Sequence, residues 1–431
     1  MVSIRQFLVV TAILLLASSG ANAQLGRPLG GLGSPLGGLP GGLLQGPLGS
    51  VNRTTGTLTH DLGSTVDTVS RDLVGRPTQA RALSRDSQGT PIVKNQVVAI
   101  SPDPQSLAIA GQLKFRVLRQ DTLGSLGLRS VTLEVPDGMS EIAALAALRS
   151  ADPYGSYDFD HVYNPTGDTI EVGHATGQTI LQADTVRIGM IDGGVAQNHP
   201  ALRAQTIQTQ IFAGNGNAPA SLHGTAIASL LVGKDDAFSG YLPGAKLFAA
   251  DVFGGAPDGG SATDIARALN WLAENGIPVT NISLAGPNNA LLAASVKAFV
   301  ASGHILVAAV GNDGPAAPPN YPAAYEGVIG VTSVDAGKNL EIDANHNAVR
   351  FAAFGVGVQA ATLPRGYANM TGTSYAAPAV AARLARTAAN PSKGAFDAAV
   401  DQLAHDASPI PGTGLLYVSA PSQTVTAARQ D

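Results

Sequence analysis

The sequence predicts an α/β protein whose main domain is a doubly wound, mostly parallel sheet. From about residue 180 onward, short apolar runs typical of buried parallel strands alternate with amphipathic helical segments. One helical segment carries Ile265, Leu269 and Leu272 on a single face, between Ser261 and Gly276. Alternation of this kind implies helices on both faces of a parallel sheet, with ligands bound beyond the carboxyl ends of the strands. The apolar runs are 186–191, 246–250, 278–284, 305–310 and 328–334.

A smaller α+β unit is expected before this domain, over residues 94–165. Asp103 followed by Pro104 is a typical helix start, and Ser140 caps a second helix. Together with the strands, these helices give the order β-α-β-β-α-β of a ferredoxin-like unit. The expected strands are 96–100, 115–118, 130–135 and the extended stretch 156–163.

The N-terminal part is expected to direct export and then to act as a linker. Residues 1–23 have a positive start at Arg5, an apolar stretch and the cleavage motif Ala21-Asn22-Ala23, which predicts a signal peptide. The apolar stretch is shorter than the ~20 residues that span a bilayer, so we expect no membrane span after its removal and a secreted or periplasmic protein. Residues 24–93 begin with repeated Pro-Leu-Gly and are expected to form a disordered linker.

Composition excludes several classes of function. A formal net charge of -5 and an aromatic content of 5% argue against a nucleic-acid partner. The absence of cysteine excludes disulfides, thiol catalysis and cysteine-based zinc sites. We expect a monomeric, exported protein whose stability depends on its packed core.

Three polar residues follow strands or open helices where a parallel sheet places its site. Asp192 ends the strand 186–191, His223 opens a helical segment in His-Gly-Thr, and Ser374 opens another in Gly-Thr-Ser-Tyr-Ala-Ala-Pro. A serine hydroxyl becomes a nucleophile when an imidazole takes its proton and a carboxylate orients that imidazole. Asn312 ends the strand 305–310, where its amide could stabilise an oxyanion beside the backbone N–H of Ser374.

These motifs resemble those of the subtilisin-like serine proteases, the subtilases. The resemblance rests on the chain order Asp, His, Ser and on the His-Gly-Thr and Gly-Thr-Ser-x-Ala-x-Pro segments. It implies a subtilisin-like catalytic domain over residues 180–425, an endopeptidase acting on polypeptides, and no cofactor for the chemistry. The family also implies a substrate-binding strand and an opposite pocket wall, which here correspond to Ser283, Leu284, Ala285, Ala309, Val310, Gly311 and Asn320.

The sequence departs from the family pattern at three positions. Gly193 stands where a Ser or Thr usually follows the aspartate, Ala226 replaces a common second histidine, and Tyr375 replaces the usual Met after the serine. None of these changes removes a catalytic group, so the resemblance still implies activity.

A structural calcium ion is the one metal that the resemblance raises. Asp335, Glu341 and Asp343 could hold calcium, as in some subtilases, and a solvated hairpin is the alternative that the sequence favours.

The 94–165 unit has the size and strand order of the inhibitory propeptides of this family. Its extended end, 156–163, could lie in the substrate cleft, and self-cleavage is expected between about Asp160 and Ala183. A parallel sheet with many non-local contacts folds slowly, which gives such a unit a chaperone role.

Two other functions remain open at this stage. An α/β-hydrolase esterase would need a Gly-x-Ser-x-Gly elbow and would have to use Asp401 and His405, but the Ser374 segment has Ala376 at the last glycine position. A binding protein on a protease scaffold would conserve the fold without turnover.

Overall fold

The computed structural model describes residues 81–167, 169–171, 183, 185–214, 216, 218–256 and 259–420. These residues all belong to one compact unit, 74–431. The predicted signal peptide 1–23 and the linker up to residue 80 lie outside the described residues. The same is true of residues 421–425, at the end of the predicted catalytic domain.

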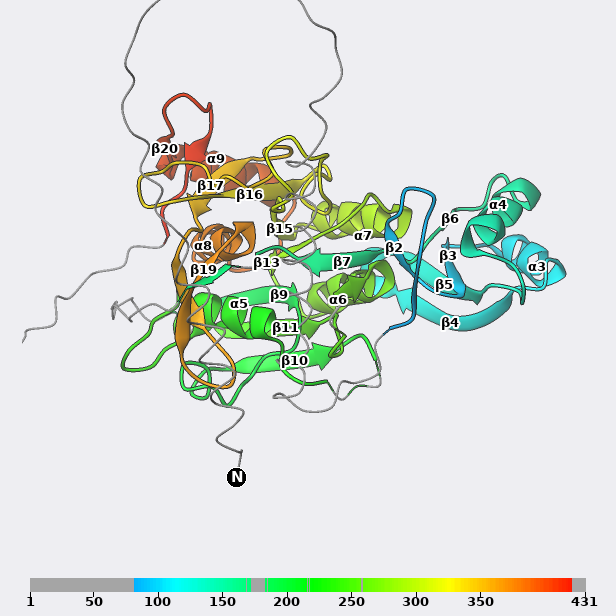
Figure 1. The fold of residues 1–431 in the computed structure, drawn as a ribbon, viewed down its shortest axis with the longest axis horizontal. Helices are drawn as coiled ribbons and strands as arrows, with labels where there is room; N and C mark the ends of the chain where they lie inside the picture. Colours follow the sequence, from blue (N-terminus) through cyan, green and yellow to red (C-terminus); the bar gives the residue numbers. More distant parts are fainter. Residues whose placement is uncertain are drawn as a thin grey trace, which may run out of the picture. The chain divides into compact units, whose positions relative to one another are not determined.

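A nine-stranded sheet forms the centre of the main domain (Figure 1). Neighbouring strands pair in parallel throughout, apart from the last pair, β20 and β21. The sheet confirms the predicted doubly wound fold. In spatial order the strands are β10 (Ile207–Ile211), β11 (Lys246–Asp251), β9 (Arg187–Asp192), β13 (Val279–Ile282), β15 (Ile305–Ala309), β16 (Val328–Val334), β17 (Phe351–Phe354), β21 (Leu416–Tyr417) and β20 (Ser408–Pro409).

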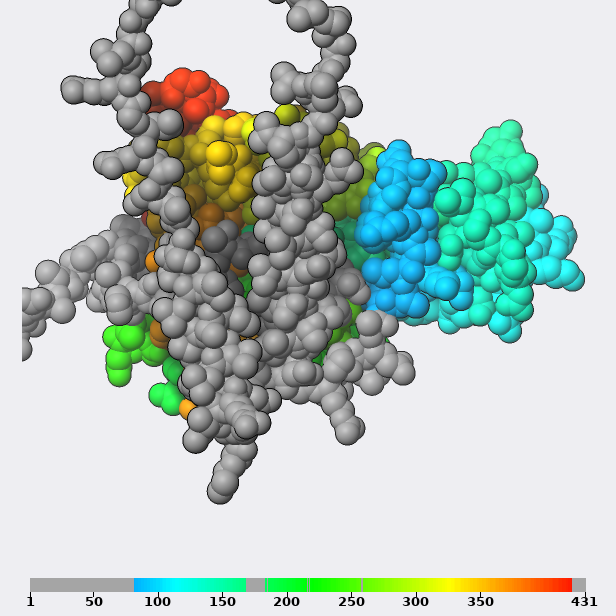
Figure 2. All heavy atoms as spheres, viewed as in Figure 1, coloured from blue at the N-terminus to red at the C-terminus, as the bar shows by residue number. Residues whose placement is uncertain are grey.

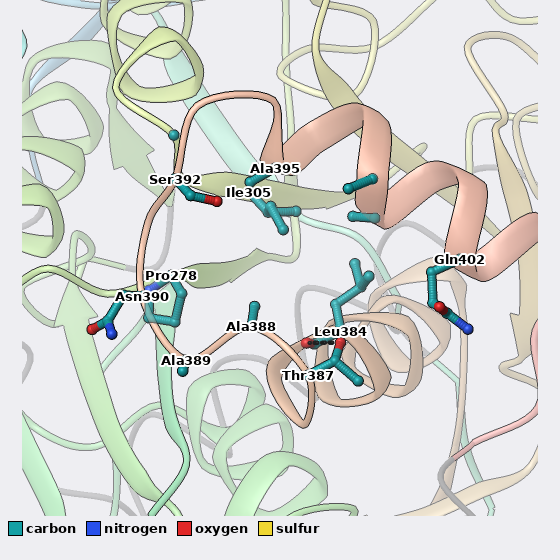
Figure 3. Close-up of a pocket in the computed structure, with 13 residues that line it drawn as sticks. Pro278, Ile305, Leu384, Thr387, Ala388, Ala389, Asn390, Ser392, Ala395 and Gln402 are labelled. Atoms are coloured by element: carbon teal, nitrogen blue, oxygen red, sulfur yellow. Dashed lines mark hydrogen bonds between the residues drawn. The ribbon is translucent and has the colours of Figure 1, made fainter.

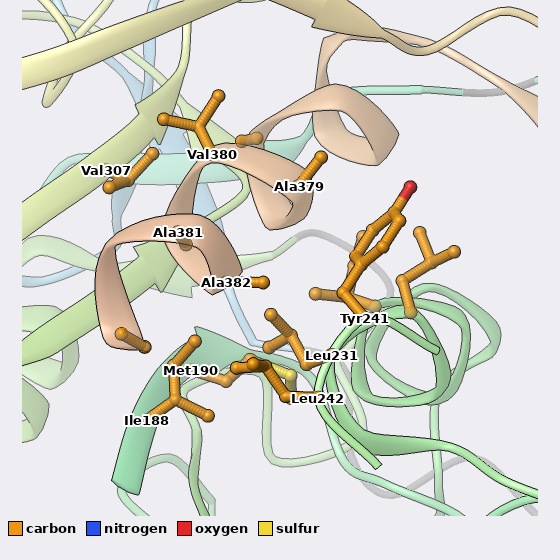
Figure 4. Close-up of a cluster of buried hydrophobic side chains, with 14 of the residues drawn as sticks. Ile188, Met190, Leu231, Tyr241, Leu242, Val307, Ala379, Val380, Ala381 and Ala382 are labelled. Atoms are coloured by element: carbon orange, nitrogen blue, oxygen red, sulfur yellow. The ribbon is translucent and has the colours of Figure 1, made fainter. Parts of the chain in front are cut away.

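Helices cover both faces of this sheet and produce two separate cores. Side chains alternate along each strand, so β9 directs Ile188 and Met190 into one core and Ile191 into the other. The first core lies under α5 (Leu222–Val232) and α8 (Thr373–Ala385), whose small residues let these helices pack closely on the sheet (Figure 4). The second core lies under α6 (Ala262–Glu274) and α7 (Ala290–Ala301). The last helix is α9 (Ala395–Asp406), and a small sheet contains β18 (Val358–Ala361) and β19 (Tyr367–Thr371).

Local signals in the sequence set the ends of these helices. Ser261 caps α6 by accepting a hydrogen bond from the N–H of Asp264, at 3.2 Å. Beyond the other end, Gly276 has a φ of +60°, the left-handed conformation that glycine adopts without strain. Both features agree with the sequence prediction.

The smaller unit has the predicted ferredoxin-like order. Its four antiparallel strands lie in the order β4-β5-β3-β6, so the first and third strands of the unit are neighbours in the middle of the sheet. Asp103 and Ser140 cap the two helices as expected. The elements are β3 (Gln96–Ile100), α3 (Pro104–Gln112), β4 (Arg116–Leu123), the 3₁₀ helix η1 (Gly124–Leu126), β5 (Leu128–Glu134), α4 (Glu141–Ala151) and β6 (Tyr157–Asp158).

The predicted linker 24–93 extends too far at its C-terminal end. Residues 83–93 form a hairpin of two short strands, β1 (Leu83–Arg85) and β2 (Pro91–Val93), drawn in blue in Figure 2. Ile92 is fully buried, and Arg81 forms an ion pair with Asp264 of α6 at 2.8 Å. Three-residue strands carry almost no periodic signal. A local turn closes the hairpin, in which Oδ1 of Asp86 accepts the N–H groups of Gln88 and Thr90, and the contacts of Ile92 and Arg81 attach it to distant residues.

Candidate active site

The predicted site residues lie at the carboxyl edge of the main sheet. Asp192 is the last residue of β9, and Ser283 directly follows β13. His223 and Ser374 occupy the second positions of α5 and α8. The two helices pack against each other and against this sheet, which brings the first turns of both toward the strand ends.

Asp192 and His223 form a buried pair. Both carboxylate oxygens of Asp192 lie 2.9 Å from Nδ1 of His223, and Oδ1 also accepts the N–H of Gly193 at 2.7 Å. Asp192 is fully buried, which holds its carboxylate in one orientation. A proton on Nδ1 facing the carboxylate leaves Nε2 with a free lone pair. Among the described residues Nε2 is buried and has no hydrogen-bond partner, so it can accept a proton.

Tight backbone packing places His223 next to Asp192. Ser221 caps α5 by accepting the N–H of Gly224 at 2.8 Å. A Cβ on Gly224 would lie 2.2 Å from the backbone oxygen of Gly193, and a Cβ on Gly193 would lie 2.3 Å from Oγ of Ser221. A side chain at position 193 therefore has no room while Ser221 is present. This contact explains the first departure from the family pattern.

Ser374 contacts a segment of the chain itself. Its Oγ donates to the backbone oxygen of Ser283 at 3.1 Å, accepts the N–H of Thr166 at 3.0 Å, and lies 2.6 Å from Oγ1 of Thr166. Its backbone N–H donates to the carbonyl oxygen of Thr166 at 3.0 Å. The hydroxyl and the backbone N–H of Ser374 therefore both bond to Thr166, the first to its N–H and the second to its carbonyl oxygen.

That segment is bound as an additional strand. β7 (Val162–Pro165) lies between β12 (Gly260–Ser261) and β14 (Leu284–Ala285) and is antiparallel to both. The N–H of Thr166 continues the pairing by donating to the backbone oxygen of Ser283 at 3.3 Å. Beyond Gly167 the chain forms β8 (Thr169–Glu171), which pairs with β19. Main-chain pairing of this kind is how peptide-binding clefts hold extended ligands.

Asn312 lies beside the carbonyl group of Thr166. Its Oδ1 accepts the N–H of Thr373 at 3.1 Å, which fixes the side-chain amide. A Cβ built on Gly372 would be 2.6 Å from Nδ2 of Asn312 and 3.1 Å from the oxygen of Thr166. The amide donor and the carbonyl oxygen thus lie around the same small space, which glycine alone leaves open.

The predicted substrate-binding residues divide into two groups. Leu284 and Ala285 pair with Pro165 and Asn164, and Ser283 bonds to both Thr166 and Ser374. The other group, Ala309, Val310, Gly311 and Asn320, lies at the end of β15, where Asn320 donates to the backbone oxygen of Val310 at 3.2 Å. Gly311 connects this wall to the first turn of α8 through Oγ1 of Thr373, at 3.1 Å.

Several residues at the site gave no clear signal in the sequence. Tyr163 is fully buried, and its hydroxyl donates to the backbone oxygen of Pro287 at 2.8 Å. Asp251 ends β11 directly beside Asp192, and burial raises the pKa of its carboxyl to about 6. The one available hint for Asp251 was an aspartate at the end of an apolar run, as in β9.

The carboxylates considered for calcium belong to a hairpin. Val334 pairs with Leu340 in an isolated bridge, and the side chain of Asp335 accepts the N–H of Asn339 at 2.8 Å. The described residues contain no group of three or more carboxylates or histidines arranged to hold a metal ion. The bridge and the Asp335–Asn339 bond show that this segment is a hairpin turn.

The residues needed for an α/β-hydrolase esterase lie elsewhere. Asp401 and His405 are exposed side chains on α9, whereas the imidazole beside Asp192 belongs to His223. This arrangement favours the peptidase interpretation over the esterase.

A separate pocket of about 430 Å³ lies at the opposite, amino end of the strands (Figure 3). It is lined by residues such as Pro278, Ile305 and Leu384, most of them apolar and remote from Ser374 in the fold.

The described part of the chain contains no helix that is both long and apolar enough to cross a membrane.

Comparison with known proteins gives the same family as the motifs. The Subtilase family profile matches residues 183–407, which is more than half of the chain. Subtilisin DY of Bacillus licheniformis is 34% identical over 208 residues, covering 46% of this chain and 75% of the relative. Subtilisin Savinase of Lederbergia lenta is 32% identical over 213 residues, covering 48% and 77%.

A solved structure supports the fold independently. Fervidolysin of Fervidobacterium pennivorans, described as a keratinolytic enzyme related to subtilisin, superposes with a TM-score of 0.61 at 18% identity, covering 80% of this chain and 63% of that one. The fold and the family match define a subtilisin-like serine endopeptidase. The chain belongs to the subtilase family.

Proposed function

We propose that this protein is an exported serine endopeptidase that uses Ser374, His223 and Asp192 as its catalytic triad. The observation that carries the proposal is the buried Asp192–His223 pair, whose imidazole lies on α5, a helix that packs against α8, where Ser374 lies on the first turn. In this structure Nε2 of His223 has no hydrogen-bond partner among the described residues, and the hydroxyl of Ser374 bonds to Thr166 and Ser283. A polypeptide bound along β12 and β14 would present its scissile carbonyl to the N–H of Ser374, as the Thr166 carbonyl does.

The chemistry is acyl transfer to serine. The hydroxyl of Ser374 attacks the carbonyl carbon while Nε2 of His223 takes its proton, and Asp192 stabilises the resulting imidazolium. The N–H of Ser374 and the amide of Asn312 hold the oxyanion. His223 then returns the proton to the leaving amine, and water releases the acyl group from Ser374 by the reverse route.

We also propose that the unit of residues 94–165, which ends in β7, is an inhibitory, chaperoning propeptide. Three contacts support close binding of this unit to the catalytic domain. Asp160 accepts the N–H of Thr263 at 2.9 Å, Asp158 accepts the N–H of Ala290 at 2.7 Å, and Asn289 donates to the backbone oxygen of Phe159 at 2.8 Å. Asp160 and Asn289 lie at the amino ends of α6 and α7, and Asp158 meets the first N–H of α7, where free N–H groups and the helix dipole favour oxygen acceptors.

Active-site labelling tests the triad. A fluorophosphonate probe should label the wild type on Ser374, and Ser374→Ala and His223→Ala should abolish both labelling and peptide hydrolysis. His405→Ala is the matched control, because the exposed imidazole on α9 has no role in this mechanism and its loss should leave activity unchanged. Labelling that survives Ser374→Ala, or loss of activity in His405→Ala, would refute the triad. A chain that never labels would point instead to a binding protein.

Export and monomeric state remain predictions from the sequence. Secretion in a bacterial host with removal of residues 1–23 tests the first, and sedimentation of the purified protein tests the second.

A further inference from the structure

The path of the chain between β12 and β14 brings one residue, Thr166, to Ser374. Thr166 is the residue whose N–H donates to Ser283 and whose carbonyl oxygen accepts from the N–H of Ser374. These two bonds hold the carbonyl group of Thr166 at the first turn of α8, where Oγ of Ser374 accepts the N–H of the same residue at 3.0 Å. The strand pairing leaves no freedom to shift, because β7 is held in register on both sides.

We propose that this peptidase cuts its own precursor between Thr166 and Gly167, and that Tyr375 restricts the residue after the scissile bond to glycine. The inference rests on the proposed catalytic role of Ser374. In the step, the Oγ–C bond to Thr166 forms as the C–N bond to Gly167 breaks. The serine proton passes through His223 to the new amino group of Gly167, and hydrolysis leaves a carboxylate on Thr166.

The restriction to glycine follows from the space around Gly167. A Cβ at this position would lie 2.7 Å from Cε2 of Tyr375 and 3.2 Å from the backbone oxygen of Thr371. Gly167 also has a φ of +144°, where residues with a side chain are strained. A real Cβ is essentially never found within 3.0 Å of a heavy atom outside its own and the adjoining residues, so either the ring or the peptide would have to move.

The ring of Tyr375 has little room to move. Tyr375 is 4% exposed, lies near the start of α8 directly after Ser374, and packs against His223 with ring centroids 5.7 Å apart. Moving the ring would disturb the imidazole that must receive the serine proton. Tyr375, which stands where the family usually has Met, therefore restricts the residue on the leaving-group side of the scissile bond.

Self-processing of the full precursor tests the bond. Wild type should release a fragment ending in Thr166 and a mature chain beginning at Gly167, measured by intact mass and N-terminal sequencing. Gly167→Ala should process at least roughly tenfold more slowly. Gly111→Ala is the matched control, because a Cβ there meets nothing within 4 Å.

Rescue tests the role of the ring. Tyr375→Ala should recover part of the processing lost in Gly167→Ala, whereas Tyr375→Phe, which keeps the ring, should not. A second measurement avoids any folding defect of the precursor. Mature wild type should cleave a quenched fluorescent peptide of residues 162–168 with a kcat/KM at least roughly tenfold above that of the Gly167→Ala peptide, and Tyr375→Ala should narrow this ratio.

The outcomes separate this inference from the proposed function. Cleavage that needs Ser374 but occurs at another bond, or equal rates for the glycine and alanine peptides, would overturn the inference and leave the triad intact. Cleavage that persists in purified Ser374→Ala would overturn the proposed function itself.

Discussion

Asp251 provides a quantitative test of the electrostatics beside the triad. This carboxylate is 4% exposed and ends β11 next to Asp192. Burial raises its pKa from 3.8 to about 6, and the negative charge of Asp192 adds to the effect. Hydrogen bonds from the N–H groups of Phe253 and Gly254 to Oδ1 oppose the rise only in part.

The raised pKa predicts how stability changes with pH. Below pH 3.8 the carboxyl of Asp251 is protonated in both the folded and the unfolded states, so its ionisation does not lower the free energy of unfolding. Between about pH 4 and 6 the unfolded chain loses the proton while the folded chain keeps it, so stability falls as pH rises. Above about pH 6 the folded state also ionises, and the cost reaches at most about 3 kcal/mol.

Asp251→Asn should therefore stabilise the protein at pH 8 by up to about 3 kcal/mol and change it little at pH 4. The asparagine Oδ1 can still accept both N–H groups, so the local turn is kept. Urea unfolding of the Ser374→Ala chain, which cannot digest itself, gives the free energy of unfolding at each pH. Asp236→Asn serves as control, since Asp236 is exposed. Equal or lower stability of Asp251→Asn at pH 8 would show that the buried carboxylate is stabilised by contacts that this reasoning omits.

Three further predictions concern the proposed chemistry and the propeptide. Asp192→Asn should lower kcat by roughly 10⁴, because the amide no longer fixes the tautomer of His223; a loss below tenfold in peptide hydrolysis would contradict this. Asn312→Leu should lower kcat by roughly 10²–10³ with little change in KM, the magnitude found for an oxyanion-hole donor in subtilisin, and an effect on KM alone would argue for a binding role instead. Tyr163→Ala should weaken the packing of β7 against the catalytic domain by roughly 3–5 kcal/mol, so that the cleaved propeptide dissociates sooner. A continuous peptide assay should then show a shorter lag before activity appears after processing. An unchanged lag would mean that the ring does not retain the propeptide.

Local patterns in the sequence predicted much of the fold. The bounds of β3 and β16 match the predicted apolar runs, and the caps at Asp103, Ser140 and Ser261 lie where short polar side chains precede helical periodicity. These signals depend on residues within a few positions of each other. Strand β13 is shorter than its apolar run because Ser283 leaves the sheet to contact Ser374 and Thr166.

Other elements had too little local signal to be predicted. β10 carries mainly polar residues at the edge of the sheet, and the hairpin of β1 and β2 consists of three-residue strands. β10 pairs with β11, which lies far along the chain, whereas β1 and β2 pair with each other and contact distant residues through Ile92 and Arg81. β propensity alone is a weak guide to such strands.

By itself, the sequence determined the family, the parallel sheet and the chemistry available at its carboxyl edge, because each motif carries its reactive group within a few residues. Tertiary structure alone decided which peptide bond faces Ser374 and which ring closes the space beyond it. Both depend on the register of β7 between β12 and β14 and on the packing of Tyr375 against His223, contacts between residues far apart in the chain. No local pattern encodes such contacts, since they exist only once the chain has folded.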